Sequence, residues 1–584
     1  MTVLTEESRS CAALPRGGRN RSSAQKPWSL RRRTIPRRAS ESATVFLIAL
    51  AIYLTAAALL DFVFRIFPLD AVSRMANGFY ILYSRDPHLA AIGFVWNPLQ
   101  SISVVPLLLF KDLWPALATH DFAASLVSVL ASAGSVYQLH AALEEWGVGR
   151  LPRLLLTLGF GLNPMILYYA GNGMSDALYL FALIATTRYL ARWIRRGDIR
   201  SLVYAAVALG AAYLDRNEAV GSAFLAGLLV LIVSLRRTAG TRRNRTMTGL
   251  SDMAIFLVPA LTAFTSWAFA SFIITRQPFA QFTSQYGNSS QSAASGAHYT
   301  LTLRLLHDVR SVEYLAPLVP VALVVALGIA IKRRDPRVLG PLTVLGGSLA
   351  FDALGVLSNS LQPWYRYFLA TVPLDILLVG CAIAGPPYVA NQIRPLRQKN
   401  SRDIRLRWKT IGASLFVLMV VAPSIPASGM GIFASSIQSS ESVELGGLVL
   451  AHPNEKDQQF ARHYAHIQAI DAYIGGMHLA DGSIVVDTFG SCTPQIVTTV
   501  PNPKVFVITN DRDFKRVLAD PLTFQAHYLL DPQPVGVDTL DALNVAYPNL
   551  YKDGAGFSRL VHQFGSDGTC AVYRLYQVTG HPGL

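Results

Sequence analysis

Long apolar runs recur along almost the whole sequence and restrict what it can fold into. Each run is long enough, or nearly so, to cross about 30 Å of hydrocarbon as a helix. The runs cover residues 44–66, 121–143, 151–170, 175–194, 201–215, 219–236, 252–275, 313–331, 338–358, 366–384 and 409–426. Only 15% of the residues are charged, against about 25% in soluble domains. The sequence therefore predicts an α-helical polytopic membrane protein with about eleven transmembrane helices.

Basic residues are concentrated in the short loops between these runs. Because cytoplasmic loops are enriched in Lys and Arg, we place these loops and the N-terminus in the cytoplasm. The loops are 147–153, 191–200, 236–245, 332–337 and 394–409. This topology requires that the shorter apolar run Pro98–Phe110 does not cross, and we expect it to be a re-entrant or interfacial helix. The net charge is +15. Because the basic residues cluster in these short loops as topology signals, we expect no nucleic-acid partner.

The predicted topology divides the chain into four parts. Residues 1–42 carry many arginines and few apolar side chains, and we expect a disordered basic cytoplasmic tail. Residues 43–426 form the transmembrane domain of a multi-pass protein of the plasma membrane. A Ser- and Gly-rich linker, 427–445, leads to an extracytoplasmic mixed α/β domain at 446–584.

The predicted C-terminal domain has one helix, near Asp457–Ile474, followed by strand-like runs between turn signals. These runs are Ser483–Asp487, Lys504–Thr509, His527–Leu530 and Cys570–Val578. Cys492 and Cys570 both fall in this external domain, where a disulfide is permitted. The alternative is a pair of buried free thiols, which pack as small apolar groups.

Polar segments that could carry chemistry all fall on the outer side of the predicted membrane. These segments are 70–88, 171–176, 215–218, 276–311 and 358–366. Asp70 closely follows the first span, where a carboxylate can act as a general base toward a substrate held in the bilayer. Because Asp also caps helices, an N-cap of the helix-like run that follows is the alternative. The Ser-rich loop 276–311 is either a lid or a disordered connector.

Four further segments occur in the order typical of a known superfamily. They are FVWNPL (94–99), NPMILYYAGNGMSDALYLF (163–181), YLDRNEA (213–219) and WYRYFLATVP (364–373). Together with Asp70, they resemble the C-type (GT-C) membrane glycosyltransferase superfamily over residues 44–384. The resemblance implies an enzyme of cell-envelope or cell-wall biosynthesis. Such an enzyme would transfer a hexose or pentose from a polyprenyl-phosphate donor to an extracytoplasmic acceptor, with inversion.

The resemblance also implies roles for individual residues. Asp70 is implied to be the catalytic base. Substrate-binding positions are implied at Asp86, His88, Asp176, Arg216, Glu218, Tyr365 and Arg366. Many members carry two acidic residues in the first external loop, but here Ala71 and Val72 follow Asp70. We therefore expect no metal or other cofactor, with a divalent cation as the alternative.

Several of these positions have a simpler structural explanation. Asp86 stands before a proline and is typical of a turn. Asp176 precedes an apolar run and is typical of a helix N-cap. Arg216 and Glu218 can neutralise each other. An outer Arg366 is less expected as an ordinary flank, and its planar fork suits phosphate oxygens, although it and the neighbouring aromatic residues can anchor the span at the interface.

Two other functions are compatible with this layout. A lipid-linked saccharide transporter or flippase is the first, although such proteins often carry mid-span charges and internal repeats that this sequence lacks. A non-catalytic membrane scaffold of the same fold is the second, because the paired acidic residues are missing. For the enzyme, the expected partners are a polyprenyl-phosphate sugar, the bilayer, and a glycan, glycolipid or protein acceptor.

Overall fold

The computed structural model describes residues 37–295, 299–385, 402–490, 492–565 and 570–582. Residues Ser42–Leu584 form one compact unit. Most of the predicted basic tail, residues 1–36, lies outside the described residues. The first part of the predicted cytoplasmic loop 394–409 does so as well.

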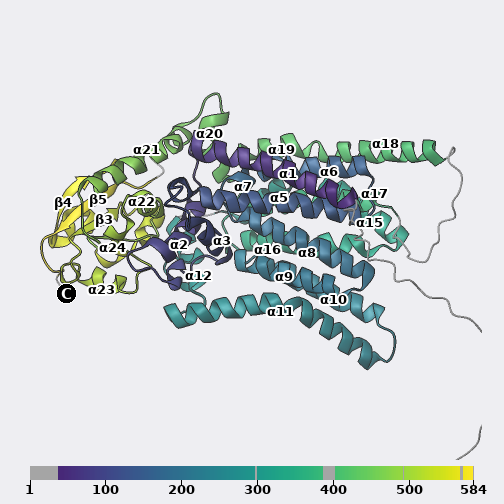
Figure 1. Ribbon diagram of the computed structural model, residues 1–584, viewed down its shortest axis with the longest axis horizontal. Coiled ribbons are helices and arrows are strands. Elements are labelled where there is room, and N and C mark those ends of the chain that lie inside the picture. Colours follow the sequence, from purple (N-terminus) through teal and green to yellow (C-terminus); the bar gives the residue numbers. More distant parts are fainter. Residues whose placement is uncertain (1–36, 296–298, 386–401, 491, 566–569, 583–584) are drawn as a thin grey trace, which may run out of the picture. The chain divides into compact units, whose positions relative to one another are not determined.

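Long helices make up most of the chain between residues 37 and 432, and many run side by side (Figure 1). They are α1 (Arg37–Ala58), α5 (Phe122–Glu145), α8 (Asp176–Arg196), α9 (Ile199–Asp215), α10 (Ala219–Arg237), α11 (Arg242–Thr275), α16 (Leu339–Leu357), α17 (Thr371–Ile383), α18 (Arg402–Val421) and α19 (Ser424–Ile432). Two bent pairs complete the set, α6 (Arg150–Gly161) with α7 (Pro164–Gly171), and α14 (Leu301–Leu315) with α15 (Val319–Arg333).

Among the described residues, seven segments are long and apolar enough to cross a membrane, or up to nine if each bent pair is one span. The prediction of a helical multi-pass membrane protein is therefore confirmed. The predicted spans at 175–194 and 201–215 form helices α8 and α9, which are not among these nine. The count of about eleven spans stays a prediction.

Both bent pairs break near a proline. The α6–α7 pair bends by 61° and the α14–α15 pair by 74°. At the first break, the Asn163 side chain accepts hydrogen bonds from the backbone N–H groups of Met165 and Ile166. Pro164 occupies the first position of α7, where its missing N–H costs no hydrogen bond. Pro320 lies in the first turn of α15 in the same way.

The run that we predicted to be re-entrant or interfacial forms the short helix α3 (Leu99–Leu108). Its ten residues measure about 15 Å, half the thickness of the hydrocarbon. It is therefore too short to span. The helix packs closely on α2 (Leu69–Tyr83), because a side chain at Gly78 of α2 would come within 2.6 Å of the Ser101 carbonyl oxygen.

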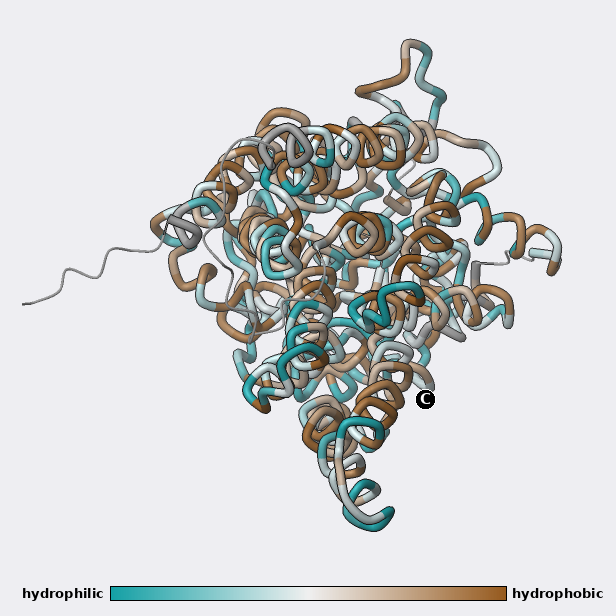
Figure 2. The backbone as a smooth tube through the Cα atoms, turned by 90° about the vertical axis from the view of Figure 1, so that its right-hand side faces the viewer, coloured by the Kyte–Doolittle hydropathy of each residue, from teal (hydrophilic) through white to brown (hydrophobic). Residues whose placement is uncertain are grey.

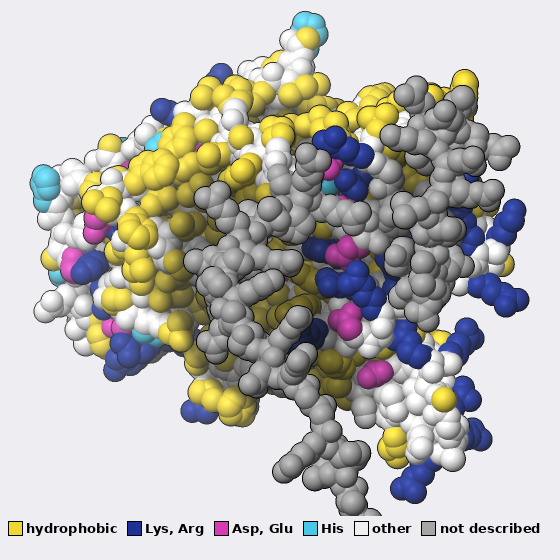
Figure 3. All heavy atoms as spheres, turned by 45° about the vertical axis from the view of Figure 1, so that its right-hand side comes forward, with side chains coloured by type: hydrophobic (Ala, Val, Ile, Leu, Met, Phe, Trp, Pro, Cys, Tyr) yellow, Lys and Arg dark blue, Asp and Glu magenta, His cyan; other side chains and the backbone are white. Residues whose placement is uncertain are grey.

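The basic loops lie together at one end of the long helices. Figure 2 faces this end, where hydrophobic helices are joined by hydrophilic turns. Figure 3 shows Lys and Arg side chains gathered on the same side. The exposed basic residues of the loops include Arg196, Arg236, Arg242, Lys332 and Arg333. The prediction that all these loops lie in the cytoplasm requires them to be at the same end of the helices.

The prediction of a linker at 427–445 is wrong over most of this range. The last candidate span continues to Ile432, and a further helix, α20 (Ser440–Val449), follows after a short turn. The small residues of this segment are packed, because Ser428 and Gly431 are buried and a side chain at Gly431 would meet the Tyr365 ring. Its Ser and Gly content therefore reflects close helix packing and not flexibility.

The C-terminal part is an α/β domain on a five-stranded mixed sheet, with strand order β2-β1-β3-β5-β4. The first three strands are parallel, whereas β5 pairs antiparallel with β3 and β4. The strands are β1 (Ile484–Val486), β2 (Phe506–Ile508), β3 (Tyr528–Pro532), β4 (Ser558–Gln563) and β5 (Tyr573–Val578). Strand β4 was not predicted. It is an edge strand with mostly exposed side chains, so its sequence lacks the apolar alternation of a half-buried strand.

Side chains alternate between the two faces of this sheet. Val485 and Val507 belong to one core with α23 (Phe514–Ala519) and α24 (Ala542–Ala546). Their neighbours Ile484 and Phe506 pack with α21 (Glu455–Gly476) and α22 (Thr493–Thr499). Cys492 is the N-cap of α22 and forms a disulfide with Cys570.

Candidate active site

Asp70 lies in the first turn of α2, and its carboxylate is held by an arginine from a distant part of the chain. Arg366 Nη2 donates to Asp70 Oδ2 at 2.5 Å. The N-cap of α2 is Pro68, with no side-chain cap, so the N-cap alternative for Asp70 is wrong. The ion pair joins α2 to the start of the candidate span Tyr365–Ile383.

Electrostatics keep Asp70 ionised. Burial would raise the pKa of the Asp70 carboxyl, but the charges of Arg366 and Arg74 outweigh it and hold the pKa below its usual value. Arg74 lies one turn further along α2 and stacks on Trp96, with its guanidinium carbon 4.4 Å from the ring centroid. Arg74 was not predicted to belong to the site.

Arg216 holds two carboxylates at once. Its Nη1 donates to Asp176 Oδ1 at 2.7 Å, and its Nη2 donates to Glu218 Oε1 at 2.7 Å. Asp176 is the first residue of α8, and the N-cap is Ser175, so the N-cap alternative is wrong here as well. Arg216 does neutralise Glu218, and it also binds Asp176.

Residues from the ion pairs of both Arg366 and Arg216 line one small cavity. Its lining includes Asp176, Arg216, Arg366, Asp352 and Tyr367. The Tyr367 ring lies between the two arginines, with its centroid 5.3 Å from Arg216 Cζ and 5.8 Å from Arg366 Cζ. The structure therefore gathers two guanidinium groups and several carboxylates around one space.

Tyr365 does not line this cavity, and its role in substrate binding stays a prediction. Its side chain is fully buried, and its hydroxyl donates to the Ser428 carbonyl oxygen of α19 at 3.3 Å. Tyr367, two residues along, lines the cavity instead. Both lie in the 3-10 helix η4 (Tyr365–Phe368), so their side chains point in different directions.

A larger, mostly apolar groove of about 520 Å³ lies between α14, α15 and α16. Phe368 lines this groove, while the next residue, Leu369, lines the small cavity. The groove and the charged cavity are therefore neighbours on the two sides of one short segment.

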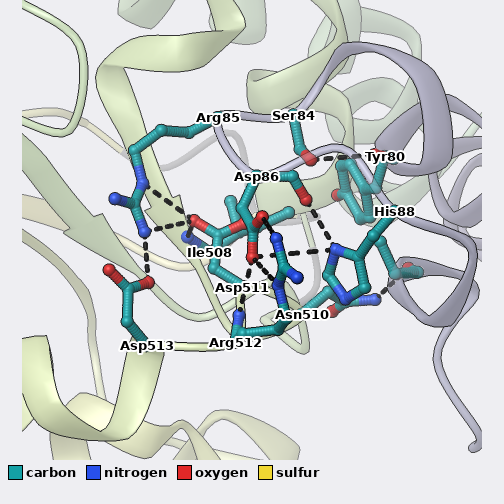
Figure 4. Close-up of polar contacts among 11 residues, drawn as sticks. Tyr80, Ser84, Arg85, Asp86, His88, Ile508, Asn510, Asp511, Arg512 and Asp513 are labelled. Carbon is teal, nitrogen blue, oxygen red and sulfur yellow. Dashed lines mark hydrogen bonds and ion pairs between the residues drawn. The ribbon is translucent and has the colours of Figure 1, made fainter.

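Asp86 and His88 do not line the small cavity, and their role in substrate binding stays a prediction. Figure 4 shows Asp86 facing Arg512 of the C-terminal domain, whose Nε donates to Asp86 Oδ2 at 2.9 Å. His88 Nδ1 lies 2.6 Å from the Asp86 carbonyl oxygen. The Arg512 side chain and backbone N–H both hold the Asp86 carboxylate, and this holds its pKa below the usual value.

A second set of ion pairs lies beside the first with the charges exchanged: here the arginine follows α2, and the carboxylates belong to the C-terminal domain. Arg85 Nε donates to Asp511 Oδ2 at 3.1 Å, and Arg85 also pairs with Asp513. The sequence Arg85-Asp86 thus meets Asp511-Arg512-Asp513 with reciprocal charges (Figure 4). We call this contact the charge latch. It ties the loop after α2 to the C-terminal domain.

The described parts of loop 276–311 are folded against both the site and the C-terminal domain. Tyr286 OH donates to Asp487 Oδ2 at the end of β1, at 2.8 Å. Tyr299 OH donates to Gln438 Oε1 at 2.5 Å, and the Gln438 carbonyl oxygen accepts from Tyr365 N. This loop also contains the short helices α12 (Ala280–Thr283) and α13 (Asn288–Ser295). The described parts of the loop are therefore ordered, and its role as a lid stays a prediction.

Within the part of the chain that the structure describes, one group of three side chains has the spacing of a metal site: His463, Cys492 and Cys570. Both of its sulfur atoms are already joined in the disulfide. The carboxylates around Arg366 and Arg216 are not such a group. Positive charge at the candidate active site is instead supplied by Arg74, Arg216 and Arg366.

Known proteins resemble this chain in structure and not in sequence. No protein-family model and no curated protein matches it. ArnT from Cupriavidus metallidurans in the apo state matches with a TM-score of 0.50 and 12% identity, over 92% of this chain and 98% of that one. ArnT bound to undecaprenyl phosphate gives a TM-score of 0.48 at 13% identity, with the same coverage. The oligosaccharyltransferase AglB from Archaeoglobus fulgidus, with an inhibitory peptide and a dolichol-phosphate, gives 0.42 at 9% identity, over 92% of this chain and 74% of that one.

The chain therefore has the fold of the GT-C membrane glycosyltransferases. This confirms the fold that the resemblance implied, and the Asp70–Arg366 pair lies within that fold.

Proposed function

We propose that the protein is a membrane glycosyltransferase that moves a sugar from a polyprenyl-phosphate donor to an acceptor of the cell envelope, outside the cytoplasm. The observation that carries this proposal is the Asp70–Arg366 ion pair. It brings a carboxylate beside a guanidinium at the predicted outer end of the helices. These are the two groups that sugar transfer from a lipid phosphate requires.

The apolar groove and the charged cavity suit the two parts of such a donor. The polyprenyl chain fits the groove between α14, α15 and α16, which is lined mainly by aliphatic residues and prolines. The phosphate is proposed to bind at the neighbouring cavity, where the planar forks of Arg216 and Arg366 match its oxygens, and this cavity of about 10 Å³ must widen to admit it. ArnT, whose apo form shares this fold, binds undecaprenyl phosphate.

The reaction we propose is a single displacement at the anomeric carbon. The acceptor oxygen attacks this carbon, its proton moves to Asp70, and the bond from the carbon to the phosphate oxygen breaks. The bonding electrons leave with the lipid phosphate, and the arginines stabilise that charge. Attack from the face opposite the phosphate inverts the configuration of the sugar.

The proposal includes no metal ion. Three arginines stand around Asp70 and the cavity, and their charges act on Asp70. They provide the electrostatic stabilisation that a divalent cation provides elsewhere. Transfer is accordingly expected to continue unchanged in excess chelator.

Reconstitution tests the proposed function. The full chain is placed in proteoliposomes with radiolabelled polyprenyl-phosphate sugars and a cell-envelope acceptor fraction. We expect the native protein to label the acceptor and Asp70→Asn to lower the rate at least about 100-fold, the usual contribution of a general base. Asp112→Asn is the matched control, because its side chain is 81% exposed, and it should retain the native rate.

The other outcomes identify the alternatives. Movement of intact sugar-lipid across the bilayer, equal in the native and Asp70→Asn proteins, would indicate a transporter. Neither transfer nor movement with any donor would indicate a scaffold. Either result contradicts the proposed enzyme.

A further inference from the structure

Arg74 is a buried cation whose hydrogen bonds are not completed by the described residues. It is 6% exposed, and its Nη1 is enclosed without a hydrogen-bond partner among them. The carboxylates of Asp70 and Asp215 act on it electrostatically. However, Asp70 Oδ2 accepts from Arg366, and neither Asp215 oxygen has a hydrogen-bond partner in the described part of the chain. Burying a charged group in this way is costly, so this guanidinium points to a ligand that completes its hydrogen bonds.

Trp96 holds the Arg74 side chain without using its N–H groups. The Arg74 guanidinium carbon lies 4.4 Å from the centroid of the Trp96 ring. The ring is itself fixed, because Trp96 Nε1 donates to Ser73 Oγ at 3.2 Å. Stacking on an aromatic face orients a guanidinium and leaves the donors at its edge available. Arg74 is thus preorganised to bind an oxyanion, either a phosphate or a carboxylate.

The position of Arg74 favours an oxyanion of the acceptor over the phosphate of the donor. Arg74 lies four residues after Asp70 in α2, so the two side chains share one face of this helix. The Asp70 side chain is 31% exposed, so an acceptor can reach it from water. The small cavity proposed for the donor phosphate is lined by Arg216 and Arg366, and Arg74 is not among its lining residues. The donor phosphate therefore leaves Arg74 without a ligand.

We propose that Arg74 binds an oxyanion of the acceptor and so directs the neighbouring acceptor hydroxyl to Asp70. This inference rests on the proposed function. It narrows the acceptor to a cell-envelope molecule with a phosphate or carboxylate group close to the hydroxyl that receives the sugar. The oxyanion takes no part in bond making or breaking, and Arg74 keeps its proton and donates hydrogen bonds from its planar edge. Trp96 is a positioning residue, because it acts through Arg74.

Kinetics of transfer by the full chain in proteoliposomes test the proposal. Arg74→Gln should raise the KM for the acceptor fraction about 10- to 100-fold, which is the usual contribution of hydrogen bonds to a charged group. The KM for the polyprenyl-phosphate sugar should stay near the native value. Arg559→Gln is the matched control, because Arg559 is exposed on β4, and it should keep both native KM values. A larger rise in the KM for the donor than for the acceptor would mean that Arg74 binds the donor phosphate, and would overturn the proposal.

Removal of the negative charge from the acceptor gives the complementary test. Methyl esterification of the acidic groups of the acceptor fraction should raise the KM of the native protein to about that of Arg74→Gln. The same treatment should change the KM of Arg74→Gln little, because the interaction is already lost in that variant. Equal effects of esterification on the native protein and on the variant would contradict the proposal.

Thermal unfolding separates this site from a structural role and from the proposed function. Without ligand, Arg74→Gln should unfold at or above the native temperature, because it removes an unpaired buried charge. With polyprenyl phosphate present to fill the donor site, inorganic phosphate should raise the unfolding temperature of the native protein but not that of Arg74→Gln. A lower unfolding temperature of the ligand-free variant, or an equal shift with phosphate, would overturn the proposal. If binding behaves as expected but no donor supports transfer, the proposed function is wrong and the oxyanion site stands.

Discussion

At the scale of single residues, the candidate site depends on which way one short turn directs its side chains. In η4, Arg366 faces Asp70, Tyr365 faces α19, and Tyr367 lies between two arginines. The Arg366 side chain is only 13% exposed and is paired, so its loss would leave Asp70, whose side chain is 31% exposed, with the charge of Arg74 but without its ion-pair partner. The geometry of this turn thus fixes both the charge and the position of the candidate base.

A buried aspartate of the C-terminal domain gives a prediction at the same scale. Asp531 in β3 is fully buried, and within the described residues its carboxylate oxygens accept no hydrogen bond. Burial raises the pKa of Asp531 to about 8, with Arg574 opposing. Between about pH 4 and pH 8 the folded state therefore holds a proton that the unfolded state has lost. Stability falls as pH rises through this window.

Asp531→Asn keeps the shape and removes the charge. At pH 8 the amides of β3 and β5 should exchange hydrogen at least about tenfold more slowly than in the native protein. At pH 4 the two proteins should exchange at similar rates. Hydrogen exchange of the full chain at both pH values measures this. Faster exchange in the variant at pH 8 would mean that the Asp531 carboxylate has a favourable partner.

Sequence reasoning found some residues of the candidate site and missed others for physical reasons. Asp70 was found because it closely follows the first span. Arg366 was found because an arginine at a predicted outer span end contradicts the usual bias of basic residues toward the cytoplasm. Arg74 was missed because one arginine on an amphipathic helix looks like a solvated side chain.

At the scale of elements, α2 connects the candidate active site to the C-terminal domain. Its first turns carry Asp70 and Arg74, and the residues after its last turn form the charge latch with the C-terminal domain. A rigid helix transmits the position of one end to the other. We therefore expect the latch to hold Asp70 in place.

Reversing one charge of the latch tests this connection. Asp86→Arg or Arg512→Asp alone puts like charges face to face and should speed hydrogen exchange at the C-terminal end of α2 about two- to fivefold. The double exchange, Asp86→Arg with Arg512→Asp, should restore the native rate. Lys515→Glu is the control, because Lys515 is exposed on the same domain but lies outside the latch. If the double variant exchanges as fast as either single variant, the two residues act independently.

The elements themselves were largely predictable where a periodic pattern was present. The apolar runs gave the long helices, and strands β1, β2, β3 and β5 lie within or beside the predicted ones. The edge strand β4 was not predicted, because its exposed side chains do not alternate. Helices α19 and α20 were not predicted either, because small residues there serve helix packing and look like a linker.

At the scale of the whole molecule, the distribution of charge explains the proposed sidedness. The basic loops gather at one end of the long helices (Figure 3). The polar groups around Asp70, Arg216 and Arg366 belong to segments that the same topology predicts to lie outside the cytoplasm. Under the proposed function, a lipid donor would reach such a site from the bilayer, and a water-soluble acceptor would reach it from outside. The segments that supply these residues are distant in the sequence, so only the fold brings them into one site.

The measurement that tests this account most directly is sugar transfer in vesicles with one known orientation. The protein is inserted with its C-terminal domain outward, the polyprenyl-phosphate sugar is in the bilayer, and a membrane-impermeant acceptor is supplied on one side only. We predict labelled acceptor when it is supplied outside, one lipid phosphate released per sugar, and transfer at least about 100-fold slower with Asp70→Asn. Product formed only from an acceptor inside the vesicles, or formed equally by Asp70→Asn, would contradict it.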